Sequence, residues 1–501
     1  MRVLDDDGGD RHGGDDDASR GPSDLLRRAA RLTPDATAVV DCAVRLNWSD
    51  LDRRVTASAL ALRSRGLLDG DRVALQLGTG ADFVVLYLGV LRAGLVAVPV
   101  NPAYTPAEVE HIVADSGASL HLDASSGRDL LATAPDGADP NNDRGGEQLA
   151  ALLYTSGTSG RSLGAMLSAR ALLANLAQIR AVEPPLLTSA DVLFLPLPLS
   201  HIFGLNAGLG MALDVGATLV LADRFDPSTT LATMAIERVT AVLGVPGQYA
   251  AWLADPELPA GFASVRFAMS GSAKLDRGLV EGFAAAGITV HDGYGLTEAA
   301  PVVAINALGA GRANPTVGSV GLPLPGIEVQ LRDPDGDPVD DADPGRLFVR
   351  GANLFSGYWP DARGGPDIDG WFGTGDIAVA DDDGQLRLVG RSADLVIVNG
   401  FNVYPAEVES VLADAAGVAE VAVVGVDDPT TGETVRAFVV PATGATLRPD
   451  ELLEQAAKSL ARFKLPTAIE IVGSLPHTVT GKIMKWQLKR AEVAEVDDGR
   501  A

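Results

Sequence analysis

Tyr154-Thr155-Ser156-Gly157-Thr158-Ser159-Gly160-Arg161 is the most informative stretch of this sequence. It joins four Ser/Thr hydroxyls and two glycines directly to an apolar run, Leu149 to Leu153, that predicts a buried strand. A hydroxyl- and glycine-rich loop after a strand offers backbone N–H groups to a phosphate, because glycine lets the backbone approach the anion closely. A flexible Ser/Gly linker has a similar composition, so this stretch on its own leaves both interpretations open.

The length and charge of the chain narrow its possible functions. Its 501 residues exceed the size at which one hydrophobic core stops growing, which predicts at least two domains. The net charge of −26 argues against nucleic acid and against docking on anionic lipid, because both need clustered Lys and Arg. An anionic substrate must therefore meet a local positive site. Cys42, the only cysteine, excludes an internal disulfide, and we expect it to pack as a small apolar side chain.

The sequence shows no targeting or membrane segment. Its first residues are acidic rather than apolar, unlike a signal peptide, and no run of about 18 apolar residues occurs that would span a bilayer. Residues 1–22, which are rich in Asp and Gly, are expected to form a disordered tail. We therefore predict a cytoplasmic protein with no membrane span.

After this tail the sequence alternates between strand and helix patterns, which indicates parallel sheets covered by helices. Residues 72–77 have the pattern of a buried strand, 81–92 that of an apolar helix and 124–146 that of a polar loop. Later in the chain the pattern changes to turn-rich β. We predict an α/β fold with a large domain over 23–390, made of parallel-sheet layers plus a β-barrel-like part, a small α+β domain over 391–490 and a tail over 491–501.

Further motifs follow the Ser/Thr/Gly loop in order along the chain. They are Ser200-His201-Ile202-Phe203-Gly204, Ser270-Gly271-Ser272-Ala273, Asp292-Gly293-Tyr294-Gly295-Leu296-Thr297-Glu298, Trp371-Phe372-Gly373-Thr374-Gly375-Asp376, Gly390-Arg391-Ser392-Ala393-Asp394, Asn399-Gly400-Phe401-Asn402-Val403-Tyr404-Pro405 and Pro476-His477-Thr478-Val479-Thr480-Gly481-Lys482. Together they resemble the adenylate-forming superfamily, which includes acyl- and aryl-CoA synthetases, peptide-synthetase adenylation domains and firefly luciferase.

The resemblance implies the two-step reaction of an acyl-CoA synthetase. A carboxylate attacks the α-phosphate of ATP, which releases pyrophosphate and leaves an acyl-adenylate. The thiol of CoA then attacks the acyl carbonyl. The first step brings two anions together, so it needs cations and N–H donors where negative charge accumulates. The cofactors implied are ATP and Mg²⁺, with CoA as co-substrate.

The resemblance also assigns residues to the nucleotide. The loop for the β- and γ-phosphates corresponds to Thr155, Ser156, Gly157, Thr158, Ser159 and Gly160. Thr297 matches the hydroxyl that contacts the α-phosphate, and Glu298 matches the Mg²⁺ ligand, a hard carboxylate for a hard cation. Asp376 matches the acid that binds both ribose hydroxyls, and Arg391 a second ribose or phosphate contact. The adenine pocket corresponds to Ser270, Gly271, Ser272, Ala273, Asp292, Gly293, Tyr294 and Gly295.

The remaining roles concern catalysis, domain motion and CoA. Lys482 matches the lysine that bridges the carboxylate and the α-phosphate in the first step, as a point cation with three donors can. His201 matches an aromatic gate near the acyl and phosphate sites. The family swings its small, mobile domain between the two half-reactions, and Ala393 matches the hinge. After the swing, the pantetheine arm of CoA would pass Asn399, Gly400 and Phe401.

The sequence departs from the family pattern at several positions. Ser162, Leu163 and Gly164 stand where Pro, Lys and Gly are usual, so leucine replaces a phosphate-loop lysine, although Arg161 lies close by. Ala393 occupies a hinge position that usually holds Asp or Lys. Ala169 replaces a usual His, and Arg346 stands where an acid is common. The proposed reaction residues Thr297, Glu298, Asp376, Arg391 and Lys482 are all present, which favours a working ligase.

Several alternatives stay open at this point. The acceptor could be the phosphopantetheine thiol of a carrier protein rather than CoA. Leu163 and Ala393 are compatible with a non-catalytic homologue that binds a nucleotide or an acyl-adenylate. A luciferase-like oxygenase is a third alternative, which nothing in the sequence demands. For the acid, small residues such as Ala207, Gly208 and Ala299 favour a medium- or long-chain fatty acid, with aryl acids next.

Overall fold

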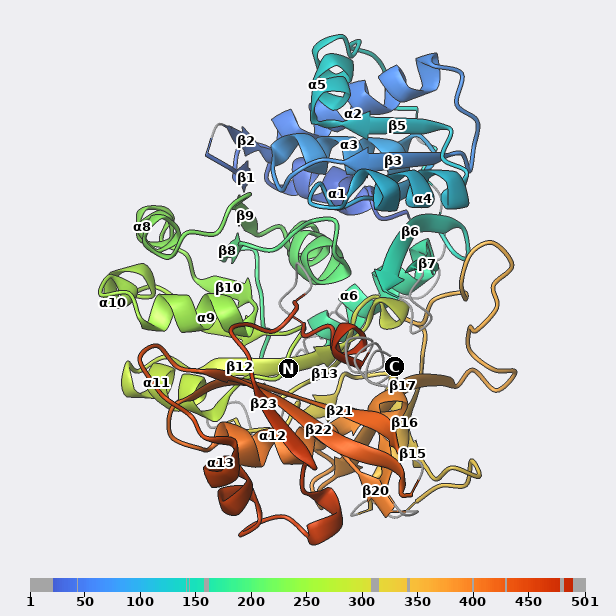
Figure 1. The fold of residues 1–501 in the computed structure, drawn as a ribbon. Coiled ribbons are helices and arrows are strands. Elements are labelled where there is room, and N and C mark those ends of the chain that lie inside the picture. Colours follow the sequence, from blue (N-terminus) through green and yellow to red (C-terminus); the bar gives the residue numbers. More distant parts are fainter. Residues whose placement is uncertain are drawn as a thin grey trace, which may run out of the picture.

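The structure is a computed structural model, and the part of the chain it describes is residues 21–489 without 43, 141, 144, 157–161, 308–314, 340–342, 399–400, 429 and 478–481, and without the side chains of Ser156 and Asn402. The predicted tails therefore lie almost entirely outside the described residues. Figure 1 shows the chain descending from a blue N-terminal layer, through a green and yellow middle, to an orange and red C-terminal part. Within the described residues, no helix is long and apolar enough to cross a bilayer.

The first layer is a five-stranded sheet surrounded by helices (Figure 1). Its strands lie in the order β5 (Leu120–Asp123), β3 (Arg72–Gln76), β4 (Val96–Pro99), β6 (Leu149–Ser156) and β7 (Ser162–Ser168). Only the β6–β7 pair is antiparallel. The helices are α2 (Trp48–Ser64), α3 (Ala81–Arg92), α4 (Pro106–Ser116) and α5 (Ala124–Ala132). The apolar residues of β3 and β4 are buried, as expected for parallel strands that are covered on both faces.

Two local predictions are wrong. The predicted polar loop over 124–146 begins with helix α5, because the Asp123 side chain accepts hydrogen bonds from the N–H groups at the helix start, including that of Ser126, and Leu130 is buried. The same Asp/Ser residues also favour turns, so composition alone does not separate the two structures. Cys42 is exposed rather than packed, because it lies in the short connection between two paired strands, β1 and β2.

A nine-stranded sheet forms the middle of the molecule. Its order is β14 (Leu322–Pro323), β13 (Val302–Ile305), β12 (Val290–Gly295), β11 (Phe267–Ser270), β10 (Ala241–Gly244), β8 (Val192–Leu195), β9 (Thr218–Leu221), β1 (Thr37–Val40) and β2 (Arg45–Asn47). The strands from β12 to β1 run parallel, and β14, β13 and β2 are added antiparallel. Parallel strands end at one edge of a sheet, so the motifs that follow β11 and β12 meet there.

The helices of this middle layer connect or follow its strands. They are α1 (Asp24–Leu32), α6 (Ala169–Arg180), the π-helix η1 (Phe203–Gly210), α7 (Met211–Val215), α8 (Pro227–Glu237), α9 (Pro246–Leu253), α10 (Leu258–Gly261), α11 (Arg277–Ala285) and the 3₁₀-helix η2 (Thr297–Ala299). The π-helix is uncommon in proteins and occurs often at functional sites. Here it begins two residues after the predicted gate residue His201.

Two antiparallel sheets form the C-terminal part. The turn-rich region folds into a sheet of β15 (Ile327–Arg332), β16 (Gly345–Gly351), β17 (Phe372–Ala380) and β18 (Leu386–Arg391). After η4 (Ser392–Asp394), a separate C-terminal domain contains β20 (Phe401–Val403), β19 (Val396–Val398), β22 (Gly432–Pro441) and β21 (Val418–Asp428), with β23 (Ala468–Ile471) beside β22. Its helices are α12 (Pro405–Ala413), α13 (Pro449–Ala456) and η5 (Arg462–Lys464). The α/β fold with a small C-terminal domain is thus confirmed.

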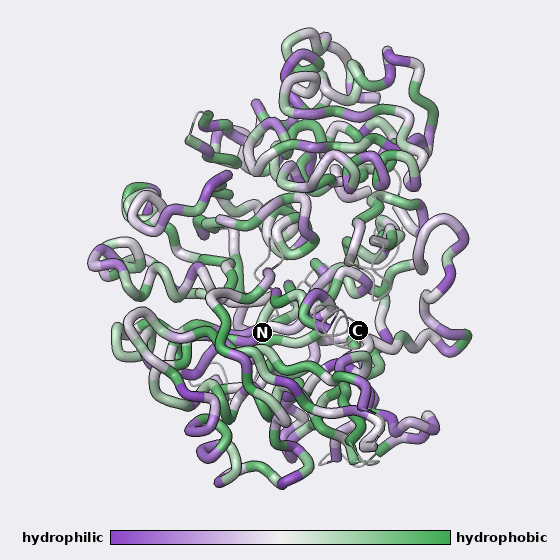
Figure 2. Tube along the Cα trace, in the orientation of Figure 1, coloured by the Kyte–Doolittle hydropathy of each residue, from purple (hydrophilic) through white to green (hydrophobic). Residues whose placement is uncertain are grey.

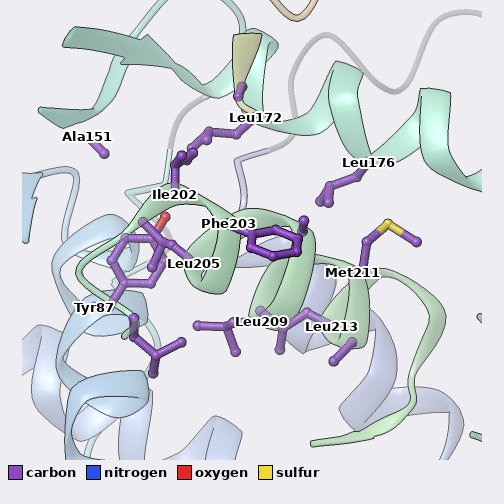
Figure 3. Packing of buried hydrophobic residues seen from close by; sticks show 14 of the residues in the cluster. Tyr87, Ala151, Leu172, Leu176, Ile202, Phe203, Leu205, Leu209, Met211 and Leu213 are labelled. Carbon is purple, nitrogen blue, oxygen red and sulfur yellow. The ribbon is translucent and has the colours of Figure 1, made fainter. Parts of the chain in front are cut away.

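The two α/β layers share one large hydrophobic core, and the small domain has its own. Figure 2 shows hydrophobic stretches running through the interior of both parts. All residues of η1 are buried in the shared core, and Figure 3 shows Phe203, Leu205 and Leu209 of this helix among side chains from neighbouring elements. Gly208 permits the close contact of η1 with β8, because a Cβ there would lie 2.7 Å from the Leu195 side chain.

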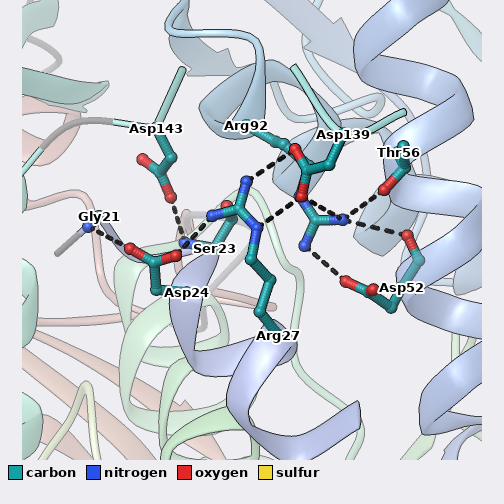
Figure 4. Close-up of polar contacts among 9 residues, drawn as sticks. All are labelled: Gly21, Ser23, Asp24, Arg27, Asp52, Thr56, Arg92, Asp139 and Asp143. Atoms are coloured by element: carbon teal, nitrogen blue, oxygen red, sulfur yellow. Dashed lines mark hydrogen bonds and ion pairs between the residues drawn. The ribbon is translucent and has the colours of Figure 1, made fainter. Parts of the chain in front are cut away.

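A network of charges attaches α1 to α2 and α3 (Figure 4). Arg92, at the end of α3, is fully buried, and its guanidinium lies 2.7 Å from Asp52 Oδ1 and 2.7 Å from Thr56 Oγ1. Asp139 Oδ2 lies 3.9 Å from Arg92 and accepts a hydrogen bond from Arg27 Nε at 2.6 Å, so it links α1 to α3. A guanidinium removed from water is stable in a protein when carboxylates and hydroxyls surround it in this way.

Substitution of Arg92 by Leu should lower the free energy of unfolding by about 2–4 kcal/mol, because it leaves the Asp52 carboxylate partly buried without its cation and Asp139 with Arg27 alone. Urea denaturation measures this change. Arg53→Leu is the matched control, since the ion pair of Arg53 with Asp50 lies on the surface and should change stability by no more than about 0.5 kcal/mol. Equal effects of the two substitutions would contradict a stabilising role for the buried network.

Candidate active site

The predicted phosphate loop lies at the tip of a hairpin. β6 and β7 pair antiparallel up to Ser156 and Ser162, so residues 157–161 connect two strand ends. Thr155 is half-buried near the end of β6. Gly157, Thr158, Ser159, Gly160 and Arg161 lie outside the described residues. Leu163, which replaces the usual lysine, is 39% exposed on β7 and pairs with Thr155.

Two aromatic side chains hold the base of this hairpin against α4. The Tyr154 hydroxyl donates a hydrogen bond to Asp115 Oδ2 at 2.6 Å, and burial, together with this bond, raises the pKa of Tyr154. The Trp359 indole N–H donates to the backbone carbonyl of Asp115 at 2.9 Å. The backbone N–H of Trp359 also donates to Gly164 O at 2.8 Å. Both strands that lead to the phosphate loop are therefore tied to one point at the end of α4.

Asp376, the predicted ribose ligand, is buried and has partners on both carboxylate oxygens. The Tyr294 hydroxyl donates to its Oδ2 at 2.6 Å, and Arg391 Nε lies 3.1 Å from its Oδ1. Burial and the negative charge of Asp376 raise the pKa of Tyr294 well above its ordinary value, so the hydroxyl stays a donor. Each carboxylate oxygen keeps a second lone pair, which leaves Asp376 able to accept hydrogen bonds from hydroxyl groups.

Glu298 lies beside Thr297 in η2, directly after β12. Its Oε1 accepts a hydrogen bond from the Tyr358 hydroxyl at 2.6 Å, and its backbone carbonyl accepts one from Phe355 N–H at 2.8 Å. Burial, and next the charge of Glu298, raise the pKa of Tyr358, so this hydroxyl is a donor at neutral pH. The described part of the chain contains no cluster of three His, Cys, Asp or Glu residues that could hold a metal. A single carboxylate nevertheless fits Mg²⁺, which binds through one or two carboxylates plus substrate phosphates.

The small domain brings Lys482 to these residues. The pKa of Lys482 is lowered from its ordinary value, first by desolvation and then by the positive charge of Arg391, while Asp376 and Glu298 act in the opposite direction. The Lys482 ammonium group is thus within electrostatic range of Arg391, Asp376 and Glu298, although the residue as a whole is exposed. The structure thus brings together four residues that the sequence predicts from separate motifs.

His201 lies on the wall of a cavity of about 50 Å³. The cavity is lined by Leu197, Pro198, His201, Phe203, Val245, Gln248 and Ser272. The Nδ1 atom of His201 accepts a hydrogen bond from the backbone N–H of Phe203 at 3.2 Å, which assigns the proton of the neutral ring to Nε2. Burial, and next the charge of Lys482, lower the pKa of His201 to about 4, so the ring is neutral at physiological pH.

The predicted adenine pocket lies at the ends of β11 and β12, which pair with Ser270 opposite Asp292. Ser272 has a φ of 70°, which is rare for a residue with a side chain and is found most often at functional sites. Asp292 is buried, its Oδ1 has no hydrogen-bond partner among the described residues, and burial raises its pKa to about 7. Gly295 is needed for a close approach, because a Cβ there would lie 2.3 Å from Pro301 O. Gly271, Ala273, Gly293 and Tyr294 belong to the same two segments.

Of the residues predicted for CoA, the structure describes only Phe401, which lies apart from Glu298 and Asp376. Asn399 and Gly400 are outside the described residues. Phe401 begins β20, is 57% exposed and stacks on Phe463 with 4.8 Å between the ring centroids. Figure 1 shows β20 at the foot of the molecule, away from β12 and β6. Ala393 lies exposed in η4, between the four-stranded sheet and the small domain, where a hinge would act.

Tyr358 and Asp115 were not predicted from the sequence. The only signal for Tyr358 is the run Gly357-Tyr358-Trp359, an aromatic pair after a glycine in a turn-rich region. Asp115 lies near the end of an ordinary amphipathic helix, α4, and its sequence gives no sign that Tyr154 and Trp359 converge on it. Both contacts join residues that are distant in the sequence, so local patterns do not reveal them.

Family profiles match most of the chain. One that is described as "AMP-binding enzyme" matches residues 26–359, and one that is described as "AMP-binding enzyme C-terminal domain" matches residues 407–482. The chain belongs to the AMP-binding enzyme family. The second match begins within α12 and ends at Lys482, so it includes the segment that brings this lysine to the large domain.

Curated relatives agree with the predicted type of enzyme. A feruloyl-CoA synthase from Amycolatopsis sp is 36% identical over 481 residues, which cover 92% of this chain and 97% of the relative. A long-chain-fatty-acid–CoA ligase from Yersinia pestis is 33% identical over 532 residues, which cover 94% of this chain and 94% of the relative. The predicted membership among adenylate-forming enzymes of the acyl-CoA synthetase type, which are AMP-forming acid–thiol ligases, is confirmed.

A solved structure gives information on the arrangement of the two domains. ATP-bound MatB from Rhodopseudomonas palustris is 34% identical to this chain, with a TM-score of 0.85 and coverage of 94% of this chain and 98% of that chain. The apo structure of MatB has the same identity and coverage but a TM-score of 0.75. The structure described here is therefore more similar overall to the ATP-bound form of MatB than to its apo form.

Replacement of Tyr358 by Phe removes the hydrogen bond that orients Glu298. A hydrogen bond to a charged group contributes about 1.5–3 kcal/mol when it is buried, and about 1–2 kcal/mol of this is left at a partly exposed site. Loss of the bond should therefore raise the Kd for Mg²⁺-ATP roughly 5- to 30-fold. Isothermal titration calorimetry with and without Mg²⁺ measures this change. Binding of metal-free ATP should stay unchanged and serves as the control. An unchanged Kd for Mg²⁺-ATP would show that Tyr358 does not position a metal ligand.

The substitution Asp292→Asn tests the raised pKa of this buried carboxyl group. In the folded state the Asp292 carboxyl group keeps its proton up to about pH 7, whereas in the unfolded state it loses the proton near pH 4. Its contribution to the free energy of unfolding of the wild type therefore falls as the pH rises from about 4 to about 7. Asn cannot ionise, so the stability of the variant relative to wild type should increase by roughly 2–3 kcal/mol from pH 5 to pH 8. Urea unfolding at both pH values measures this, and a pH-independent difference would contradict the raised pKa.

Proposed function

We propose that this enzyme activates a carboxylic acid with ATP as an acyl-adenylate, with release of pyrophosphate, and then transfers the acyl group to the thiol of CoA. The observation that carries this proposal is the position of Lys482 within the electrostatic reach of Glu298, Asp376 and Arg391. These side chains come from both domains and offer, at one place, a cation for the reacting anions and carboxylates for the ribose and the metal ion.

The nucleotide would be held at three points. The hairpin loop after Thr155 offers backbone N–H groups and hydroxyls to the β- and γ-phosphates. Asp376, already held by Tyr294 and Arg391, would accept hydrogen bonds from the ribose hydroxyls. The buried Asp292 Oδ1, which has no partner among the described residues, would gain a donor from the amino group of adenine. Mg²⁺ at Glu298, when bound, would neutralise part of the phosphate charge.

The first chemical step joins two anions, so its barrier depends on local positive charge. Lys482 would donate to the carboxylate oxygen and to the α-phosphate at the same time, and Thr297 would contact the α-phosphate with its hydroxyl. The enzyme as a whole carries a charge of −26, so Lys482 and Arg391 act as local cations in a generally acidic molecule. Neutral His201, with its proton on Nε2, would supply a donor without adding charge.

The cavity beside His201 supports an acid with a compact, uncharged tail. His201 is neutral, and both amide atoms of Gln248 already bond to the protein backbone, so the residues that line the cavity include no cation to pair with a second carboxylate. An engineered cavity of about 150 Å³ binds benzene, whereas this one measures about 50 Å³, so it has little room for a long chain in this arrangement. The Phe203 ring limits it, since a Cβ on Gly271 would lie 3.0 Å from that ring. A compact acid is therefore favoured over the long fatty chain that the small residues suggested. The feruloyl-CoA synthase relative favours an aryl acid among these, for which the cavity would have to widen.

The second step would need a different arrangement of the domains. Phe401 is exposed and distant from the site, so the segment that is proposed to contact CoA must move to reach the acyl carbonyl. Rotation at Ala393 in η4 would achieve this, with the domain boundaries at 23–390 and 391–490. The names of the curated relatives favour CoA over a carrier protein as the acceptor. The cytoplasm stays a prediction from the sequence.

Pyrophosphate release tests the proposal directly. The enzyme is mixed with Mg²⁺-ATP and one acid from a panel of benzoic, cinnamic, hexanoic, palmitic and malonic acids, with and without CoA. We expect release that depends on an aryl or short aliphatic acid and turnover that rises with CoA. Dependence on palmitic acid alone would overturn the compact pocket. Absence of release with every acid, while calorimetry shows ATP binding, would favour the non-catalytic homologue.

The variant Lys482→Ala separates the two half-reactions. Loss of the bridging cation should slow acid-dependent pyrophosphate release by roughly 10²-fold or more, because the electrostatic stabilisation of the developing charge is lost. Transfer to CoA from a chemically prepared acyl-adenylate should stay close to the wild-type rate. An equal loss in both assays would contradict a role of Lys482 that is limited to the first step.

A further inference from the structure

The segment that carries Lys482 is attached to the small domain at identifiable points. Ile483 is bridged to His477, and Met484 N–H donates to Pro476 O at 2.8 Å. The Ile483 side chain also packs on an apolar cluster of the small-domain sheet that includes Phe438. These contacts fix the backbone around Lys482, and Leu488 in the following helical turn packs on the same apolar cluster.

An ion pair attaches the segment after Lys482 to the rest of the small domain. Lys485 Nζ lies 2.7 Å from Glu409 Oε1, and the two side chains are only 20% and 21% exposed. The same Oε1 atom accepts a hydrogen bond from the backbone N–H of Val423 at 2.7 Å. Glu409 belongs to α12 and Val423 to β21, so one carboxylate joins the segment after Lys482 to both a helix and a strand of the small domain.

We propose that Glu409 and Lys485 form a positioning pair that holds Lys482 in the geometry needed for adenylation. Neither residue touches the predicted site; the pair acts through the backbone between positions 482 and 485. This inference rests on the proposed function for its kinetic consequence, but the anchoring itself is independent of it.

The pair has a consequence that an ordinary stabilising contact would not have. All of its atoms belong to the small domain, so it persists when that domain moves. Lys482, however, is proposed to act only in the first step. Loosening the pair should therefore reduce adenylation and leave transfer from a supplied acyl-adenylate intact, whereas general damage to the small domain would reduce both.

The chain contains a matched control on the same helix. Lys464 Nζ lies 2.7 Å and 2.8 Å from the two carboxylate oxygens of Glu407, which is also in α12. This second pair anchors η5 rather than the segment of Lys482. Glu409→Gln and Glu407→Gln thus each remove one carboxylate charge from one helix and keep the side-chain shape, and only the first should affect Lys482.

Hydrogen exchange of backbone amides measures the anchoring without any activity assay. The amides of Met484 and Gln487 are both hydrogen-bonded, the latter to Met484 O at 3.0 Å. In Glu409→Gln their exchange should become roughly tenfold faster or more, because a largely buried partner is left unpaired, and in Glu407→Gln it should stay at the wild-type rate. Unchanged exchange in Glu409→Gln would overturn the proposed anchor.

Kinetics then test the positioning role. Glu409→Gln and Lys485→Met should lower the kcat for acid-dependent pyrophosphate release by roughly tenfold with a KM for the acid close to wild type, and Lys485→Arg should restore most of the rate. Glu407→Gln should retain the wild-type rate of release. Equal losses in both half-reactions would contradict the positioning role and would mean that the pair only stabilises the small domain. A wild-type enzyme that releases no pyrophosphate would contradict the proposed function, and the exchange experiment would still decide the anchor.

Discussion

The carboxylate of Asp376 is the point at which the separate parts of this enzyme meet. It is held by the hydroxyl of Tyr294 from the nine-stranded sheet and by the guanidinium of Arg391, the last residue before the connection to the small domain. A buried carboxylate is costly unless it is hydrogen-bonded and paired with a cation. This requirement ties the middle layer, the four-stranded sheet and the domain connection to one small group of atoms.

Hydrogen bonds also position other carboxylates of the candidate site. Glu298 is held by Tyr358, and the base of the phosphate-loop hairpin is held by Tyr154 and Trp359 through Asp115. Each of these groups is positioned by a neutral donor rather than by an opposite charge. Glu298 and Asp115 therefore each have a donor without needing a cation of their own, which matters in a protein whose net charge is strongly negative.

Much of the fold could be predicted because buried helices and strands have recognisable patterns of apolar residues in the sequence. The helix over 81–92 and the strands of the central sheets have continuous apolar runs, and the structure contains them at nearly the expected boundaries. Helix α5 was missed because its Asp/Ser-rich start is equally typical of a turn. The exposure of Cys42 was missed because a side chain at a turn depends on how two strands pair, which no local pattern records.

The candidate site likewise has a part that the sequence predicts and a part that it does not. Residues that lie within sequence motifs, such as Glu298 and Asp376, could be predicted individually, but their partners could not, because Tyr358 and Tyr294 reach them across long sequence separations. The size of the cavity beside His201 also depends on tertiary packing, since the Phe203 ring belongs to the buried π-helix and lies against the backbone of Gly271.

The exposed thiol of Cys42 has a practical consequence for observing this enzyme at work. Because it is the only cysteine in the chain and lies in the β1–β2 connection of the large domain, a fluorescent dye can be attached there at a single known place. A second cysteine introduced on the exposed surface of the small domain would complete a pair of labels. Single-molecule energy transfer between them would then follow the two domains in real time, through each turnover, without removal of any native cysteine.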